Sequence, residues 1–207
     1  MDIIQCENEL DVAKFANQWC SDSIKEVDAQ SLYLPAGGTP IPLYKMWEEA
    51  HPDFLNQLKL IQIDEVVTGS KTGVFKSFFE EHLPSYLKQM VWIGDESIQA
   101  DLAILGLGPN GHVAFHEPHL SRKFKWGEVD LSDNTCERLG LEVGCRGKTY
   151  GLQSFLATKK VLLMVCGESK QEVLHSLLSF NTTLPATVLM GHADFTIVAD
   201  RMAYPGK

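Results

Sequence analysis

The sequence predicts one α/β domain, covering residues 1–207, that is built on a doubly wound and mostly parallel β-sheet with helices on both faces. Three short apolar runs, at residues 31–34, 102–105 and 161–166, are typical of strands buried on both sides. Helical spacing of apolar residues between these runs predicts the crossover helices that parallel strands require. We therefore expect a Rossmann-like fold, for which this chain length is sufficient to bury one core.

The other elements follow from the same periodicities along the chain. Residues 8–19 carry apolar side chains at helical spacing, and the side chains of residues 58–63 alternate in a way that predicts a strand. Between about residues 119 and 148 a mixed polar stretch, longer than an ordinary loop, predicts a mobile flap. The predicted elements are helices at 8–19, 41–50, 72–83 and 171–178 and strands at 31–34, 58–63, 102–105, 161–166, 185–189 and 195–199.

Composition and charge exclude several classes of partner. The formal net charge of −9, with no basic cluster, argues against a surface for nucleic acid or an anionic membrane. No apolar run has the length of a membrane span and no secretory signal pattern opens the chain, so we expect a cytoplasmic protein that is not exported. The five cysteines lack metal-ligand spacing, which predicts reduced thiols and no metal site. The expected partner is a small molecule, and the sequence is compatible with a homo-oligomer.

A glycine-rich segment follows the predicted strand at 102–105. Residues 106–111 match the dinucleotide fingerprint G-x-G-x-x-G, which requires a helix that opens at its third glycine. Pro118 follows too soon for such a helix, which argues against a nicotinamide or flavin site. Instead, His112 and Glu117 place an imidazole and a carboxylate just past the end of a buried strand, where ligands bind in open α/β sheets. A glycine turn with a core histidine is the structural alternative.

The segment after the first predicted strand has the character of an anion cradle. Gly37 and Gly38 are followed by Thr39, suited to a helix N-cap, and by Pro40, suited to the first helical turn. Free backbone N–H groups and the positive end of the helix at 41–50 would point at the same place. A plain turn between strand and helix is the alternative interpretation.

Two further strands end in charged residues. Asp64 and Glu65 follow the strand at 58–63, and Lys170 follows the strand at 161–166. Because the carboxyl ends of parallel strands meet at one edge of a sheet, we expect these residues to converge with the cradle and with His112. The set suits a small phosphorylated substrate that undergoes acid–base chemistry.

Four segments carry a resemblance to a known family. Residues 34–40 (LPAGGTP), 63–65 (IDE), 106–118 (GLGPNGHVAFHEP) and 167–170 (GESK) resemble, in order and spacing, the signature segments of the glucosamine-6-phosphate deaminase family. The wider superfamily includes 6-phosphogluconolactonase and shares most of these features. The Ala-Phe-x-Glu-Pro ending of the third segment resembles the deaminases specifically. The resemblance extends over residues 11–200.

The resemblance implies an isomerising deaminase of the hydrolase class, which converts glucosamine 6-phosphate to fructose 6-phosphate and ammonia without a metal or organic cofactor. Asp64 would move a proton from C2 to C1 of the opened sugar. His112 would catalyse ring opening, oriented by Glu117. The residues implied in phosphate binding are Gly37, Gly38, Thr39 and Lys170.

One catalytic position departs from the common pattern of the family. Asn110 stands where many deaminases have an aspartate, so His112 lacks a second charged partner and its imidazole should be less basic. The arginine that helps to bind phosphate in relatives has two candidates in this chain, Arg138 and Arg146.

Two other functions compete with the deaminase. In a 6-phosphogluconolactonase, His112 would activate water against a lactone carbonyl. A sugar-phosphate-binding protein would have kept the cradle and lost turnover. Asp64 separates these hypotheses, because neither a lactonase nor a binding protein needs a carboxylate that shuttles a proton between adjacent carbons.

Overall fold

Seven parallel strands form the central sheet, in the order β1-β10-β9-β6-β2-β3-β5. The computed structural model describes residues 2–204. The strands of this sheet are β1 (Asp2–Cys6), β2 (Ser31–Leu34), β3 (Lys59–Gln62), β5 (Met90–Val91), β6 (Leu102–Gly106), β9 (Lys160–Val165) and β10 (Phe195–Asp200). The predicted α/β class with a mostly parallel sheet is confirmed.

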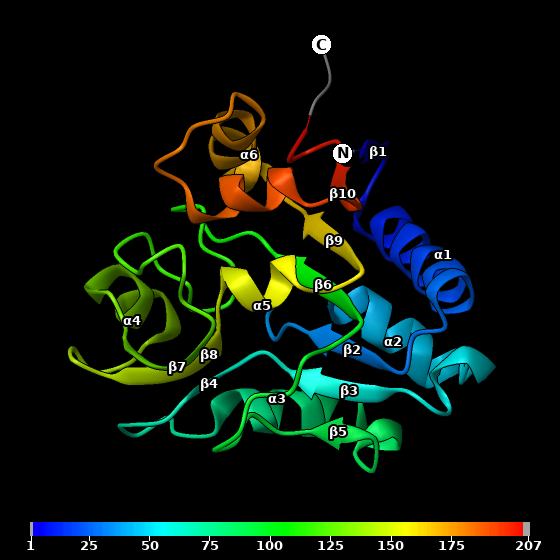
Figure 1. Cartoon of the computed structure of the whole chain (residues 1–207), viewed down its shortest axis with the longest axis horizontal. Helices are drawn as coiled ribbons and strands as arrows, with labels where there is room; N and C mark the ends of the chain where they lie inside the picture. Colours follow the sequence, from blue (N-terminus) through cyan, green and yellow to red (C-terminus); the bar gives the residue numbers. More distant parts are fainter. Residues whose placement is uncertain (1, 205–207) are drawn as a thin grey trace.

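Helices cover both faces of the central sheet (Figure 1). One face packs against α1 (Glu9–Val27), α2 (Ile41–Ala50) and α3 (Val74–His82). The other face packs against α5 (Leu152–Leu156), α6 (Gln171–Leu178) and the 3-10 helix η4 (Pro185–Gly191). Three shorter 3-10 turns complete the connections: η1 (Asp53–Leu55), η2 (Pro84–Tyr86) and η3 (Glu168–Lys170).

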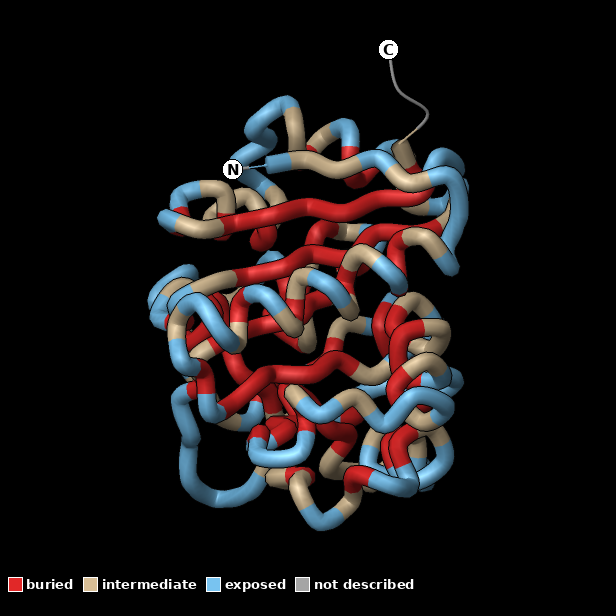
Figure 2. The backbone as a smooth tube through the Cα atoms, turned by 90° about the vertical axis from the view of Figure 1, so that its right-hand side faces the viewer, coloured by how far each residue is buried: buried red, intermediate tan, exposed pale blue. Residues whose placement is uncertain are grey.

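Alternate side chains of the strands enter two separate cores. In β6, Leu102 and Ile104 pack with the helices on one face, whereas Ala103 and Leu105 pack with those on the other. All four are fully buried, which explains the continuous apolar runs in the sequence. In Figure 2 the central strands run as buried segments through the middle of the molecule, with partly exposed helices around them.

A second, antiparallel sheet lies beside the first. It contains β4 (Asp64–Val66), β8 (Arg146–Tyr150) and β7 (Trp126–Asp130), in the order β4-β8-β7. With α4 (Asp133–Leu139), strands β7 and β8 supply regular structure to the region 119–148. The mobility expected of that region stays a prediction.

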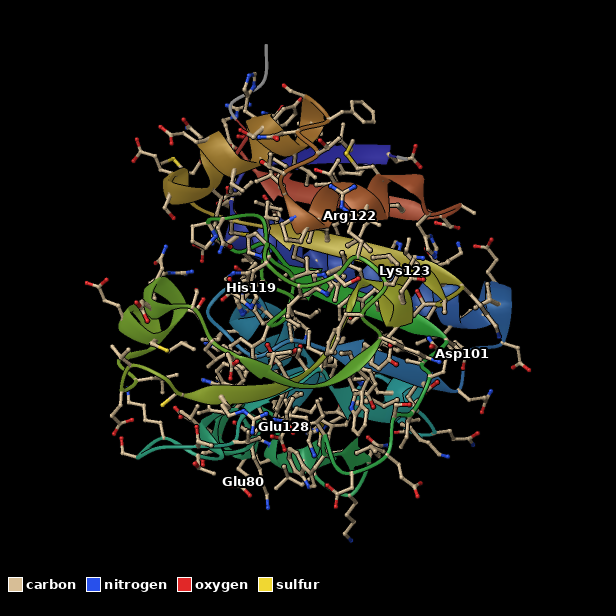
Figure 3. All side chains as sticks on the ribbon, turned by 60° about the vertical axis from the view of Figure 1, so that its left-hand side comes forward. Glu80, Asp101, His119, Arg122, Lys123 and Glu128 are labelled. Atoms are coloured by element: carbon tan, nitrogen blue, oxygen red, sulfur yellow. The ribbon has the colours of Figure 1, made fainter. Side chains whose placement is uncertain are left out.

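The order of the strands reverses between β2 and β6. From β2 the chain adds β3 and β5 on one side, and from β6 it adds β9 and β10 on the other. The carboxyl ends of β2 and β6 therefore flank a topological switch point, where ligands bind in open α/β sheets. At the opposite, amino end Asp101 ties strands together by accepting hydrogen bonds from Gln30 N and Ser31 Oγ. Figure 3 labels Asp101 on the side of the molecule away from α4.

The predicted strands need correction near both ends of the chain. The predicted strand at 185–189 is wrong, because these residues form η4. Pro185 has no N–H to donate, and Thr187 N instead bonds back to Leu184 O at 3.2 Å. Strand β1 was not predicted, since its partly exposed residues give no continuous apolar run. No helix among residues 2–204 is both long and apolar enough to cross a membrane.

Candidate active site

A cavity of about 220 Å³ opens at the carboxyl edge of the sheet, at the switch point between β2 and β6. The loop after β2, the start of β4, the turn after β6, and residues of α4 and η3 line it. Six of the eight predicted site residues lie in its wall, namely Gly37, Gly38, Thr39, Asp64, His112 and Lys170. The expected convergence of these residues is confirmed, whereas Asn110 and Glu117 lie behind His112.

The loop after β2 leaves its backbone open to the cavity. Gly37 has a φ of +119°, a conformation that favours glycine, and a Cβ added at Gly37 or Gly38 would meet nothing within 4 Å. The N–H groups of Gly37, Gly38 and Thr39 form no hydrogen bond within the described part of the chain. This arrangement presents donors to an anion.

The predicted helix cap at Thr39 is wrong. The N-cap of α2 is Pro40, without a side-chain hydrogen bond, and its carbonyl accepts from Tyr44 N at 3.0 Å. Thr39 therefore lies one residue before the cap, in the turn that faces the cavity. Its hydroxyl is not engaged in capping.

The acidic pair divides into two environments. Asp64 lines the cavity and is 7% exposed, and burial together with the charge of Glu65 raises its carboxyl pKa well above the usual value. Glu65 instead accepts hydrogen bonds from Phe75 N at 3.0 Å and Lys76 N at 2.7 Å, in the first turn of α3. Asp64 is thus available to a ligand, while Glu65 fixes β4 to α3.

The glycines after β6 make room for an imidazole. A Cβ at Gly108 would lie 2.2 Å from Cδ2 and Nε2 of His112, so the ring can rest there only above a glycine. Gly108 N also bonds to His112 O at 2.8 Å, which closes the turn. No helix opens at Gly111, because the chain continues into an isolated bridge between Val113 and His116. The helix that a dinucleotide fingerprint requires at its third glycine is therefore not formed here.

Glu117 lies beside His112 without a hydrogen bond to it. Glu117 Oε2 is 3.8 Å from His112 Nδ1, and that nitrogen is buried without a hydrogen-bond partner within the described part of the chain. Asn110 connects the two, because its Nδ2 donates to Glu117 Oε2 at 2.9 Å and its Oδ1 accepts from His112 N at 3.2 Å.

The electrostatic surroundings keep the imidazole neutral and the carboxylate ionised. Burial lowers the pKa of His112 to about 4, which outweighs the raising effect of Glu117. For Glu117, burial raises the pKa, but hydrogen bonds from Thr135, Asn110 and Ser132 and the nearby His112 together lower it. His112, the member of this pair that lines the cavity, is therefore unprotonated at neutral pH.

Two cationic side chains complete the wall. Lys170 and Arg138 both line the cavity, and burial together with Arg138 lowers the pKa of Lys170. The other arginine candidate, Arg146, forms ion pairs with Glu128 at 2.9 Å and Asp130 at 3.5 Å on the small sheet. Of the two candidates for an anion contact, the structure brings Arg138 to the site.

Comparison with known proteins identifies the family. No protein-family model matches the chain. A glucosamine-6-phosphate deaminase from Mycoplasma mycoides subsp. mycoides is 31% identical to this chain, and the alignment covers 98% of this chain and 96% of that relative. The chain belongs to the glucosamine-6-phosphate deaminase family. The resemblance expected from the four signature segments is thus confirmed.

Solved structures agree with the membership in the deaminase family. The structure of a monomeric glucosamine-6-phosphate deaminase, described as a missing link of the NagB superfamily, has a TM-score of 0.82 at 25% identity and covers 99% of both chains. A 6-phosphogluconolactonase from Leishmania guyanensis has a TM-score of 0.79 at 18% identity and covers 99% of this chain and 98% of that chain. The second likeness shows the shared fold alone.

Several residues of this deaminase-family cavity were not found from the sequence. Phe75 of α3 and Leu139 of α4 add apolar surface, and Thr135 of α4 lies between the cavity and Glu117. Ser132, a preferred N-cap residue, followed by Asp133 in the first turn is the signal that could have indicated α4. No group of three or more metal-ligating side chains occurs among residues 2–204.

Proposed function

We propose that this protein converts glucosamine 6-phosphate and water to fructose 6-phosphate and ammonia. The observation that carries the proposal is the presence of a buried carboxylate, Asp64, in the same anion-binding cavity as the imidazole of His112. A proton shuttle between adjacent carbons needs such a carboxylate, whereas hydrolysis of a lactone does not.

His112 opens the sugar ring in the proposed reaction. Its neutral imidazole moves a proton from the C1 hydroxyl of the sugar toward the oxygen of the sugar ring. Glu117 stabilises the positive charge that develops on the imidazole during this transfer. Asn110 positions Glu117 through its amide and thereby takes part indirectly. Opening yields the aldehyde that carries the amino group at C2.

Asp64 then catalyses the isomerisation. As general base it removes the proton from C2 while the C1 carbonyl oxygen gains a proton, which gives an enolamine. It then returns its proton to C1 while the amino group gives one up, which gives the imine of the ketose. Water adds to the imine carbon and the nitrogen leaves as ammonia, so one water is consumed and the overall class is hydrolytic. No cofactor takes part in these steps.

The phosphate group lies in the cradle in this proposal. The backbone N–H groups of Gly37, Gly38 and Thr39 donate to its oxygens, while Lys170 and Arg138 supply positive charge. The partner is a small-molecule sugar phosphate rather than nucleic acid. We further propose a cytoplasmic setting, which agrees with the presence of five free thiols.

A paired assay tests the proposed function. Purified protein is supplied with glucosamine 6-phosphate, with ammonia release as the readout, and separately with 6-phosphogluconolactone, with hydrolysis as the readout. We expect ammonia. Lactone hydrolysis without ammonia would establish the lactonase alternative, and binding of sugar phosphate without either product would indicate a binding protein.

Two variants separate the proposed roles of the acid–base groups. Asp64→Asn should lower turnover by about 10²–10⁴-fold with any form of the substrate, since it removes the general base. His112→Gln should slow the cyclic amino sugar strongly and retain more activity in the reverse direction, to the extent that fructose 6-phosphate opens spontaneously. Equal losses in both directions would assign His112 to the proton transfer itself.

A further inference from the structure

Glu117 is anchored from two sides. Its Oε2 accepts a hydrogen bond from Asn110 in the turn after β6. Its Oε1 accepts from Ser132 Oγ at 3.1 Å and from Thr135 Oγ1, both at the start of α4. The carboxylate is fully buried, so within residues 2–204 these three donors take the place of solvent.

The two hydroxyl groups are fixed by the helix that carries them. Ser132 is the N-cap of α4, and its Oγ accepts from Thr135 N at 3.3 Å. Its single hydroxyl hydrogen has two acceptors within reach, Glu117 Oε1 at 3.1 Å and Thr135 Oγ1 at 3.2 Å. Thr135 is 4% exposed and directs its own hydroxyl to Glu117 Oε1. Both donors therefore belong to the start of α4, where Ser132 is bonded to the helix backbone and Thr135 is buried.

The hydrogen bonds that hold Glu117 set its distance from His112. The distance of 3.8 Å between Glu117 Oε2 and His112 Nδ1 exceeds a hydrogen bond by about 1 Å. Because His112 Nδ1 is buried without a partner in the described residues, a movement of Glu117 on that scale decides whether the imidazole is paired. The hydroxyl groups on Oε1 set where the opposite oxygen lies.

The same helix also reaches the cavity. Arg138 follows Thr135 by three residues, so the two side chains lie on one face of α4, and both line the cavity. The position of α4 thus fixes the Arg138 guanidinium and the Glu117 carboxylate together.

We propose that Ser132 and Thr135 are positioning residues for the ring-opening step, because their hydroxyl groups hold Glu117 beside His112 and tie this pair to α4. This inference rests on the proposed function, since it assigns the residues to a step of that reaction.

Kinetics with a matched set of variants provide the first test. Thr135→Val keeps the shape of the side chain and removes the hydroxyl donor, whereas Thr135→Ser keeps the donor. Thr158→Val is the control, because the buried Thr158 hydroxyl lies outside the cavity wall and donates to Phe155 O at 2.7 Å. With cyclic glucosamine 6-phosphate we expect Thr135→Val to lower kcat by about 10- to 100-fold with KM within about twofold, the scale of a misplaced catalytic group. Thr135→Ser should restore most of the loss, and Thr158→Val should keep the wild-type kcat. An unchanged kcat in Thr135→Val, or no recovery in Thr135→Ser, would overturn the proposal.

A titration that needs no turnover provides the second test. The carboxyl carbon of Glu117 is followed by NMR in the wild-type protein, in Thr135→Val and in Thr158→Val. We expect the pKa of Glu117 to rise in Thr135→Val alone, because a donor to the ionised form is lost. An equal pKa in all three proteins would overturn the contact. If the wild-type protein releases no ammonia, the proposed function fails, and the titration then decides by itself whether these hydroxyl groups hold Glu117.

Discussion

At Gly108 the backbone lies directly against the imidazole of His112. A Cβ built there would be 2.2 Å from two ring atoms, a distance that forces the whole ring to move. Gly108 therefore positions the imidazole of His112, although the spacing of the glycines in this segment resembles that of a pyrophosphate-binding turn. The physical requirement in both cases is a close approach to the backbone.

Gly108→Ala should therefore impair catalysis while the fold persists. We expect kcat for ammonia release to fall by about 100-fold, since a displacement of about 1 Å has that effect on a positioned group. Gly191→Ala serves as the control, because a Cβ at Gly191 would meet nothing within 4 Å. Circular dichroism checks the fold, and wild-type kcat in Gly108→Ala would contradict the assignment of His112.

Asp64→Asn should abolish activity and stabilise the protein. Folding raises the pKa of the Asp64 carboxyl above its value of about 3.9 in the unfolded chain. Above about pH 3.9 the folded protein is therefore destabilised, and the loss of stability grows until the pH reaches the folded pKa. We expect Asp64→Asn to increase the free energy of unfolding by about 1 kcal/mol at pH 8 and by less at pH 5, measured by urea denaturation at each pH. A variant less stable than the wild type at pH 8 would contradict the buried, unpaired character of this carboxylate.

The same pKa shift predicts the pH dependence of the reaction. The general base must be ionised, so kcat/KM should fall as pH decreases through the raised pKa of Asp64. The midpoint of this fall in kcat/KM should lie above about pH 4, the pKa of an ordinary aspartate. A pH profile of ammonia release from pH 4 to pH 9 measures it, and a midpoint near pH 4 would contradict the assignment.

At the scale of elements, the central strands and the longer helices could be predicted because their side chains repeat along the chain. Strand β2 and helices α2 and α6 have the bounds that the periodicity gave. Strands β4 and β7 carry no such pattern, since β4 has three residues and β7 buries only Val129. Their pairing with β8 depends on contacts between distant segments, which local periodicity does not encode.

The junction of β4 and α3 gives a prediction for Glu65. Its two oxygens accept from four donors, namely Val66 N, Phe75 N, Lys76 N and Gln62 Nε2. In Glu65→Gln an amide NH₂ replaces one of these oxygens and leaves buried donors unpaired, so we expect a loss of about 2 kcal/mol in urea denaturation.

Glu80→Gln on the exposed side of α3 is the matched control for Glu65→Gln. Glu80 makes a surface ion pair with Lys76 at 3.9 Å, and its loss should change stability by less than about 0.5 kcal/mol. Figure 3 labels Glu80 at the periphery of the molecule. Equal effects of the two substitutions would show that Glu65 does not join β4 to α3.

At the scale of the whole molecule, the cavity combines residues that are far apart in the sequence. The switch point made the convergence of Gly37, Asp64, His112 and Lys170 predictable, because each follows a parallel strand. Arg138 belongs to a helix outside the central sheet, so no strand end indicated its place. The sequence thus predicted the part of the site that the sheet builds, left Arg138 as one of two arginine candidates, and missed Thr135 and Leu139 of α4.

Binding of a sugar phosphate should stabilise the entire fold, because the cavity exists only when these segments are assembled. A ligand at about 100 times its Kd adds about 2.7 kcal/mol to the free energy of unfolding, which for a chain of this size corresponds to roughly 5–10 °C in Tm. We expect fructose 6-phosphate to produce such a shift in differential scanning fluorimetry, whereas fructose should not.

Lys170→Ala should reduce the shift at the same ligand concentration, since it removes a charge from the cavity wall. Lys45→Ala, on the exposed surface of α2, should leave it unchanged. A shift of equal size in Lys170→Ala and in the wild type would mean that the phosphate is held elsewhere.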